Sequence, residues 1–204
     1  EVRLREALAQ VIEDYDRILI DSAPSLDDLT INALTAADAA VIVTHTKKWS
    51  LDGLGQLLDT IGNVQRYSNP GLSVAGIIVN QHEAADLARH LGTAGDGPEA
   101  IARALAHRLE RTLIATLGPE GAIAAAPGAG IIRVPSLPVK VVDTTGAGDT
   151  FCGVLAAGLD RGMRLPDAMR RAAVAGALAC TGAGAQPSFP TLAEIEAAAG
   201  SDRT

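Results

Sequence analysis

A glycine-rich stretch in front of a helical pattern constrains this chain more than any other feature. An apolar run ends at Val142, the sequence Asp143-Thr144-Thr145-Gly146-Ala147-Gly148-Asp149 follows, and small residues then recur at helical spacing. The first N–H groups of a helix have no partner inside the helix, and the helix dipole adds positive potential there. The stretch therefore predicts an anion site, with Asp149 placed to take a proton from an attacking hydroxyl. The alternative is a plain turn in which Asp149 caps the helix.

Short apolar runs alternate with helical patterns along the rest of the chain. The runs predict strands at residues 17–21, 39–43, 72–79, 112–116, 123–126, 131–134 and 139–142. The helical patterns predict helices at residues 1–14, 27 or 28 to 36, 50 or 52 to 61, 86–91, 98–111, from the glycine-rich stretch to 161, 165–179 and 192–199. Strands linked by helices form parallel βαβ units. We therefore expect a single α/β domain over residues 1–204, a three-layer α/β/α sandwich with a mostly parallel, Rossmann-like central sheet.

Composition and charge exclude some classes of function. The formal net charge is −7 and aromatic residues make up 2% of the chain. Surfaces that bind nucleic acids need clustered Lys and Arg and often stacking rings, so no nucleic-acid partner is expected. No signal peptide or long apolar run is recognisable, so we expect no membrane association and a cytoplasmic protein. Cys152 and Cys180 lie in Ala- and Gly-rich helical patterns and are expected to be small core residues.

Residues 143–151 match without a gap the signature of the ribokinase (PfkB-type) sugar kinases, and the resemblance covers about Asn80 to the C-terminus. It implies that Asp149 is the catalytic base. The same resemblance implies that the N–H groups of three neighbours stabilise the transferring phosphoryl group, and these are Gly146, Ala147 and Gly148. Asn80 and Glu83 match the Asn-x-x-Glu of this family that helps to hold Mg²⁺ and its waters. The alternative for Asn80 and Glu83 is a capping box at the start of a helix, and the two roles are compatible.

The resemblance also implies a nucleotide pocket and a monovalent cation site. The ribokinase "T-L-G-x-x-G" turn, which lines the nucleotide, corresponds to residues 116–121, and the loop at residues 184–190 resembles the one that closes over the adenine. The implied ATP or ADP contacts are Thr116, Gly118, Gly121, Thr145, Gly184 and Ala185. The implied K⁺ ligands are Asp143, Thr145 and Ser188. Without the resemblance, residues 116–122 would be interpreted as a plain hairpin turn.

The first 79 residues resemble another family, the ParA/MinD partition ATPases. Residues 15–25 are similar to the Walker-B-type strand and loop of these ATPases, and Asp21 matches the aspartate that lies near their Mg²⁺. The partition ATPases also need a GxxxxGK[ST] phosphate loop, and this sequence has none. We therefore interpret Asp21 as vestigial.

Together the two resemblances predict a chimera of ParA-like residues 1–79 and a ribokinase-like C-terminal half, residues 80–204. The two resemblances favour a recombined or engineered protein, and the start inside a charged helical pattern suggests a fragment or an engineered piece. Because the kinase half that holds the sugar is not recognisable, the prediction is weak nucleotide binding with little or no phosphotransfer. The alternatives are an active ATP-dependent carbohydrate kinase, a non-catalytic scaffold and, least favoured, a ParA-type ATPase. A sheet edge exposed at the seam could pair two chains into a homodimer.

Overall fold

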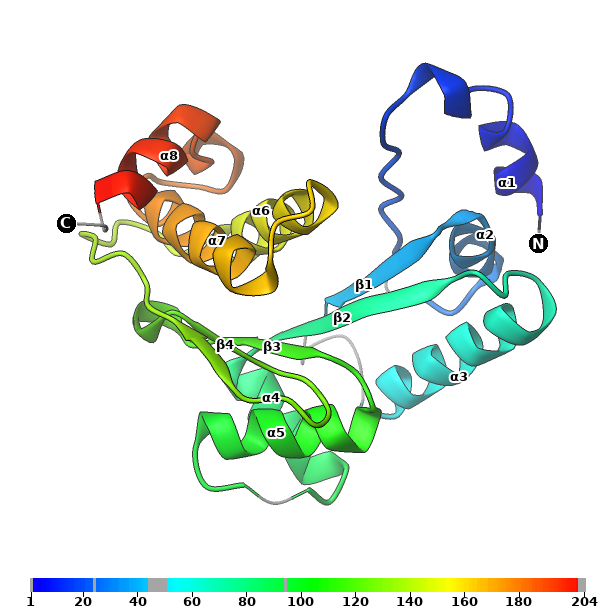
Figure 1. The fold of residues 1–204 in the computed structure, drawn as a ribbon, viewed down its shortest axis with the longest axis horizontal. Coiled ribbons are helices and arrows are strands. Elements are labelled where there is room, and N and C mark those ends of the chain that lie inside the picture. Colours follow the sequence, from blue (N-terminus) through cyan, green and yellow to red (C-terminus); the bar gives the residue numbers. More distant parts are fainter. Residues whose placement is uncertain (1, 24, 44–50, 94, 202–204) are drawn as a thin grey trace. The chain divides into compact units, whose positions relative to one another are not determined.

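A computed structural model describes residues 2–23, 25–43, 51–93 and 95–201 (Figure 1). The chain divides into two compact units, Glu1–Ile77 and Ile78–Thr204. The boundary lies within strand β2 (Ser73–Asn80), and each unit is described by itself. The single domain expected over residues 1–204 stays a prediction.

The first unit is built from two short helical turns, two longer helices and two strands. Its elements are α1 (Arg3–Leu8), the 3₁₀ helix η1 (Ile12–Asp14), α2 (Asp28–Ala36), β1 (Ala39–Val43), α3 (Leu51–Tyr67) and the greater part of β2. The Asp27 carboxylate accepts the Leu29 and Thr30 N–H groups, which makes Asp27 the N-cap of α2. Asp28, the other residue predicted as a possible start of this helix, is the first helical residue. Arg5 donates to the Thr35 carbonyl and thereby ties α1 to the end of α2.

The second unit carries helices on either side of short strands. Its elements are α4 (Gln81–His90), α5 (Pro98–Leu109), β3 (Leu113–Thr116), the 3₁₀ helix η2 (Gly118–Glu120), β4 (Ala122–Ala125), β5 (Ile132–Val134), α6 (Ala147–Asp160), α7 (Leu165–Ala179), the 3₁₀ helix η3 (Gln186–Ser188) and α8 (Leu192–Ser201). Small residues let α6 and α7 approach closely. A Cβ on Gly158 would lie 3.1 Å from the Ala168 Cβ, and one on Gly176 would lie 3.2 Å from the Ala147 carbonyl oxygen.

The strands form one five-stranded sheet in the order β1-β2-β3-β4-β5, flanked by helices. This confirms the predicted α/β fold class. The sheet is mixed, because β3 pairs antiparallel with β4, from Leu113 opposite Ala125 to Thr116 opposite Ala122, and β4 pairs antiparallel with β5. Residues 117–121, which include η2, join β3 to β4, and residues 126–131 join β4 to β5. The core of the second unit is aliphatic, with Leu105, Leu113, Ile123 and Met169 completely enclosed.

Two predicted strands are wrong. Residues 17–21 have no regular secondary structure, and Leu19 is 93% exposed. A strand needs a neighbour for its backbone groups, and among the described residues this segment has none. Residues 139–142 are likewise irregular, with Val141 and Val142 exposed, because the Val142 N–H donates to the carbonyl of Cys180, after α7, instead of to a strand.

Helix boundaries differ from the expectations at two places. The predicted helix over residues 1–14 is broken into α1 and η1, with no buried residue in either element. The helix expected from Asp86 begins five residues earlier, at Gln81, because Asn80 caps it. Of the two predicted starts of α3, Ser50 lies outside the described residues, and the helix begins at Leu51, just before Asp52.

Candidate functional site

The start of α6 has free backbone donors. Gly146 is the N-cap in the left-handed region, with φ of 79°, and Ala147 is the first helical residue. The Ala147 N–H donates to the Thr144 carbonyl, whereas the N–H groups of Gly148 and Asp149 have no partner among the described residues. Both residues are exposed. Two free N–H groups at the positive end of a 14-residue helix can bind an anion.

Asp149 lies in the first turn of α6 and does not cap the helix, so the plain-cap alternative is wrong. Its carboxylate is exposed beside the two free N–H groups. A carboxylate at this position is able to accept a proton from a group that approaches the same anion.

Asp143 fixes the loop that leads into α6. Its Oδ1 accepts the Thr145 N–H at 2.9 Å and the Thr145 hydroxyl at 2.7 Å, and its Oδ2 accepts the Gly184 N–H at 2.8 Å. These bonds, the Thr145 hydroxyl first, lower the pKa of Asp143 from its ordinary value of 3.8. One carboxylate therefore holds together two loops that are 41 residues apart in sequence.

The second loop packs directly on Gly146. A Cβ on Gly146 would lie 3.0 Å from the Ala185 Cβ and 3.0 Å from a ring carbon of Phe189. Gly184 takes φ of 77°, and the Ser188 hydroxyl donates to the carbonyls of Gly184 and Ala185. The structure thus brings together the predicted residues Asp143, Thr145, Gly146, Gly184, Ala185 and Ser188.

Thr116 is the last residue of β3, and the turn after it holds Gly118 and Gly121. Gly118 has φ of 60° and faces open space, which suits a close approach of a ligand. Gly121 has φ of 93°, and a Cβ there would lie 2.1 Å from the Val134 carbonyl oxygen. Gly121 is therefore required by packing against the end of β5.

Asn80 and Glu83 form a complete capping box at the start of α4. The Asn80 Oδ1 accepts the His82 and Glu83 N–H groups, and the Glu83 Oε2 accepts the Asn80 N–H at 2.8 Å. Glu83 is buried, with 4% of its surface exposed. The capping alternative is confirmed.

Cys152 lies near both candidate carboxylates. Burial raises the pKa of its thiol to about 11, and the charges of Asp149 and Glu83 raise it further in the same direction. The starts of α4 and α6 are therefore close enough for both carboxylates to act on one thiol. Sequence analysis missed the electrostatic effect of Glu83 on Cys152 and the bond between Asp143 and Gly184, because no local pattern joins residues so far apart in the chain.

Some predicted roles gain no support from the arrangement. Asp21 belongs to the first unit, where it is exposed and lies in an irregular segment. Within the described ranges, no group of three or more His, Cys, Asp or Glu side chains is placed to hold a metal ion.

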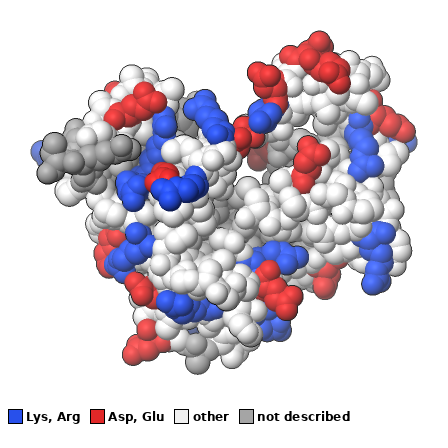
Figure 2. Space-filling model, viewed as in Figure 1, with Lys and Arg blue, Asp and Glu red and all other residues white. Residues whose placement is uncertain are grey.

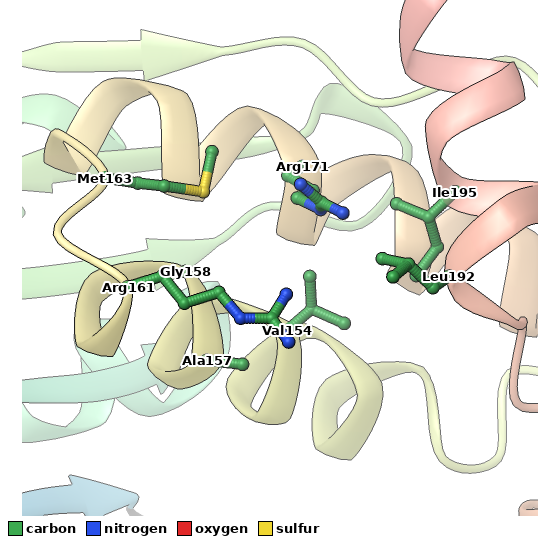
Figure 3. Close-up of a pocket in the computed structure, with 8 residues that line it drawn as sticks. All are labelled: Val154, Ala157, Gly158, Arg161, Met163, Arg171, Leu192 and Ile195. Atoms are coloured by element: carbon green, nitrogen blue, oxygen red, sulfur yellow. The ribbon is translucent and has the colours of Figure 1, made fainter. Parts of the chain in front are cut away.

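A separate cavity lies between α6, α7 and α8 (Figure 3). It has a volume of about 230 Å³ and is lined by aliphatic side chains together with Arg161 and Arg171. Arg171 is paired with Glu196 of α8 at 2.9 Å. No predicted site residue lines the cavity. The C-terminal half of α6 contributes to the cavity, whereas the candidate anion site lies at the N-terminus of this helix.

Charges of both signs are mixed on the face shown in Figure 2. Arg133 of β5, for example, pairs with Glu99 of α5 at 3.1 Å and with Glu120 of η2 at 3.0 Å. Such alternation does not make the continuous basic surface that nucleic acids need. No helix in the described part of the chain is both long enough and apolar enough to span a membrane.

Comparisons with known proteins give two kinds of relative. The model of a family described as pfkB family carbohydrate kinase matches residues 31–192, so the match begins earlier than the predicted seam at Asn80. Ribokinase from Lactococcus lactis is 40% identical over 121 residues, which are 59% of this chain and 37% of that protein. The sporulation initiation inhibitor protein Soj of Bacillus subtilis is 46% identical over 84 residues, which are 41% of this chain and 33% of that protein.

The fold agrees with solved ribokinase structures. Ribokinase from Cryptococcus neoformans, solved in complex with ADP, superposes with a TM-score of 0.65 and 28% identity, over 82% of this chain and 55% of that one. The chain spans about a third of the two curated relatives and about half of this structure.

Proposed function

Because the chain belongs to the pfkB family of carbohydrate kinases, we propose that it retains the ATP- and phosphate-binding half of such a kinase. One observation carries this proposal. The N–H groups of Gly148 and Asp149 at the start of α6 have no partner among the described residues, and the loop that leads into this helix is bonded to Gly184 through Asp143. Donors that are fixed before a ligand arrives lose little freedom when they bind it.

In this proposal the residues around α6 have different roles in phosphoryl transfer. The segment Gly146–Gly148 presents N–H groups to the transferring phosphoryl group, and those of Gly146 and Gly148 have no hydrogen-bond partner among the described residues. Asp149 accepts the proton of the acceptor hydroxyl. Gly118 and the loop of Gly184 and Ala185 lie against the nucleotide, together with Thr116 and Thr145.

The proposed cation sites differ in how well the side chains fit them. Mg²⁺ keeps several waters and takes few carboxylates, so one carboxylate and one amide side by side at the start of α4, Glu83 and Asn80, suit a water-mediated Mg²⁺ site. When bound, Mg²⁺ neutralises phosphate charge. Both oxygens of Asp143 already accept hydrogen bonds, so a K⁺ site at Asp143, Thr145 and Ser188 has to use their remaining lone pairs.

We further propose that the protein is a recombined chimera with weak nucleotide binding and little or no sugar phosphorylation. The Soj-like and ribokinase-like relatives, which match 41% and 59% of the chain, support this proposal. An acceptor that is not held in place loses the advantage of positioning, which supplies up to about 7–11 kcal/mol of a barrier. The alternatives are an active carbohydrate kinase and a scaffold without ligands.

Calorimetric titration with ATP in the presence of Mg²⁺ and K⁺ tests nucleotide binding. We expect weak, saturable heat that disappears in Gly148→Asp, because the new carboxylate repels phosphate. Gly153→Asp is the matched control, since a Cβ at either glycine would meet no atom within 4 Å and both residues are exposed on α6. No heat with the unchanged protein, or equal loss in both variants, would refute phosphate binding at this helix.

Release of ADP on addition of sugars tests phosphotransfer. Little or no release is expected, and any release should be lost in Asp149→Asn if Asp149 is the base. Efficient release that needs sugar would instead establish the active kinase.

Because Soj is 46% identical over 84 residues, a ParA-type ATPase is the second candidate. ATP hydrolysis without sugar that is lost in Asp21→Ala and kept in Asp149→Ala would favour it.

A further inference from the structure

Strand β1 presents an unprotected edge. It is the last strand on one side of the sheet, and among the described residues only β2 pairs with it. Its sequence, Ala39-Ala40-Val41-Ile42-Val43, contains no charge and no proline. Edge strands in natural proteins usually carry such residues because an apolar edge pairs readily with another strand.

The same unit carries a strand-forming segment that lacks a sheet. Ile18, Leu19 and Ile20 have the composition of a strand, and their exposure alternates as it does in strands, with the two isoleucines half-buried and Leu19 93% exposed. No backbone group of residues 18–21 has a hydrogen-bond partner among the described residues. Leu19 is the most exposed of the large apolar side chains.

We propose that residues 17–21 of one copy pair with β1 of a second copy, and the reverse, in a symmetric homodimer. The pairing gives hydrogen-bond partners both to the backbone of residues 18–21 and to the outer edge of β1. A twofold axis makes the two contacts of the dimer identical. It also covers Leu19 together with Val41 and Val43, which are 44% and 49% exposed. A parallel register that aligns Arg17 with Asp38 of the partner subunit would bring opposite charges together where the strands begin.

Sedimentation velocity and hydrogen exchange on the whole chain test this proposal. We expect a dimer whose amides at residues 18–20 and 39–43 exchange more slowly as protein concentration rises. Leu19→Pro should yield a monomer, because proline lacks the N–H and resists strand pairing. The monomer fold should be unaffected, since the Leu19 N–H has no partner among the residues that the structure describes.

Leu29→Lys is the control variant. Leu29 is 78% exposed in the first turn of α2, so it is another exposed leucine outside both strands. It should leave the dimer intact. A monomer at every concentration overturns the proposal, as does a dimer that survives Leu19→Pro or dissociates equally in Leu29→Lys. Exchange on the unchanged protein decides the matter even if Leu19→Pro does not fold.

Discussion

Gly118 and Gly121 lie three positions apart in one turn, yet they are glycines for different reasons. Both glycines have positive φ. A Cβ added to Gly121 would lie 2.1 Å from a backbone oxygen, whereas a Cβ added to Gly118 would meet no atom within 4 Å. We predict that Gly118→Ala costs about 1–2 kcal/mol of unfolding free energy through its left-handed conformation alone. Gly121→Ala should cost clearly more, because β5 must also move.

Urea denaturation of the two variants measures the difference. Equal losses of stability would show that the approach of Gly121 to Val134 relaxes at little cost. The pair also separates packing from ligand binding. Gly118→Ala should weaken nucleotide binding in the folded protein, since its new methyl group points into open space, and it should do so without changing the sheet.

At the scale of elements, α4 depends on its capping box. Asn80 accepts two N–H groups and Glu83 accepts a third, so Asn80→Ala should lower the unfolding free energy by about 1 kcal/mol. Asn63→Ala is the matched control. Asn63 is exposed within α3, and its side chain makes no hydrogen bond to any residue that the structure describes, so its replacement should change stability little.

Glu83→Gln separates the capping role from the proposed Mg²⁺ role. Glutamine at this position of a capping box still accepts the Asn80 N–H, so stability should change less than in Asn80→Ala. If Glu83 holds Mg²⁺ through water, the variant should need more Mg²⁺ for the same ATP affinity. Calorimetry at several Mg²⁺ concentrations gives the answer, and an unchanged Mg²⁺ dependence would leave Glu83 with its capping role alone.

Elements were predictable where local signals agreed. Asp27 before an apolar helical pattern located α2, and the run Ala39–Val43 located β1. Prediction failed where the outcome depends on distant partners. Residues 17–21 have strand propensity, but no strand in the described part of the chain pairs with them, and the Val142 N–H bonds to the Cys180 carbonyl after α7.

At the scale of the whole molecule, acid should destabilise the fold. Hydrogen bonds from Thr30, Thr145 and Thr191, respectively, are the main causes that lower the pKa values of Asp27, Asp143 and Glu194 from ordinary values of 3.8, 3.8 and 4.5. A carboxylate with a lowered pKa in the folded state stabilises that state fully above its unfolded pKa. This stabilisation is lost as pH falls from the unfolded value through the folded one.

Thermal melts at decreasing pH test this expectation. The melting temperature should fall as pH drops below about 4.5, the highest of the three ordinary values. Asp143→Asn should melt lower at neutral pH and lose less on acidification, because one of the three contributions is already gone. An acid dependence identical to that of the unchanged protein would mean that Asp143 contributes nothing to it.

The residues of the candidate site were predictable from the sequence, whereas the contacts between its loops were not. The spacing of residues 143–149 indicates a helix start with free N–H groups, and the structure has one. The contacts that hold it, from Asp143 to Gly184 and from Gly146 to Ala185 and Phe189, join loops about 40 residues apart. Such contacts follow from packing of α6 and α7, which no local pattern specifies.

The bond between Asp143 and Gly184 also has a kinetic consequence. It closes a long loop that contains both α6 and α7, and closing such a loop is entropically costly until the helices between its ends have packed. An interaction that forms after the folding transition state affects the rate of unfolding and leaves the rate of folding nearly unchanged. The bond from Asp143 to Gly184 would then determine how long the two loops stay together once they have assembled. In stopped-flow experiments, Asp143→Asn should unfold faster than the unchanged protein and refold at the same rate.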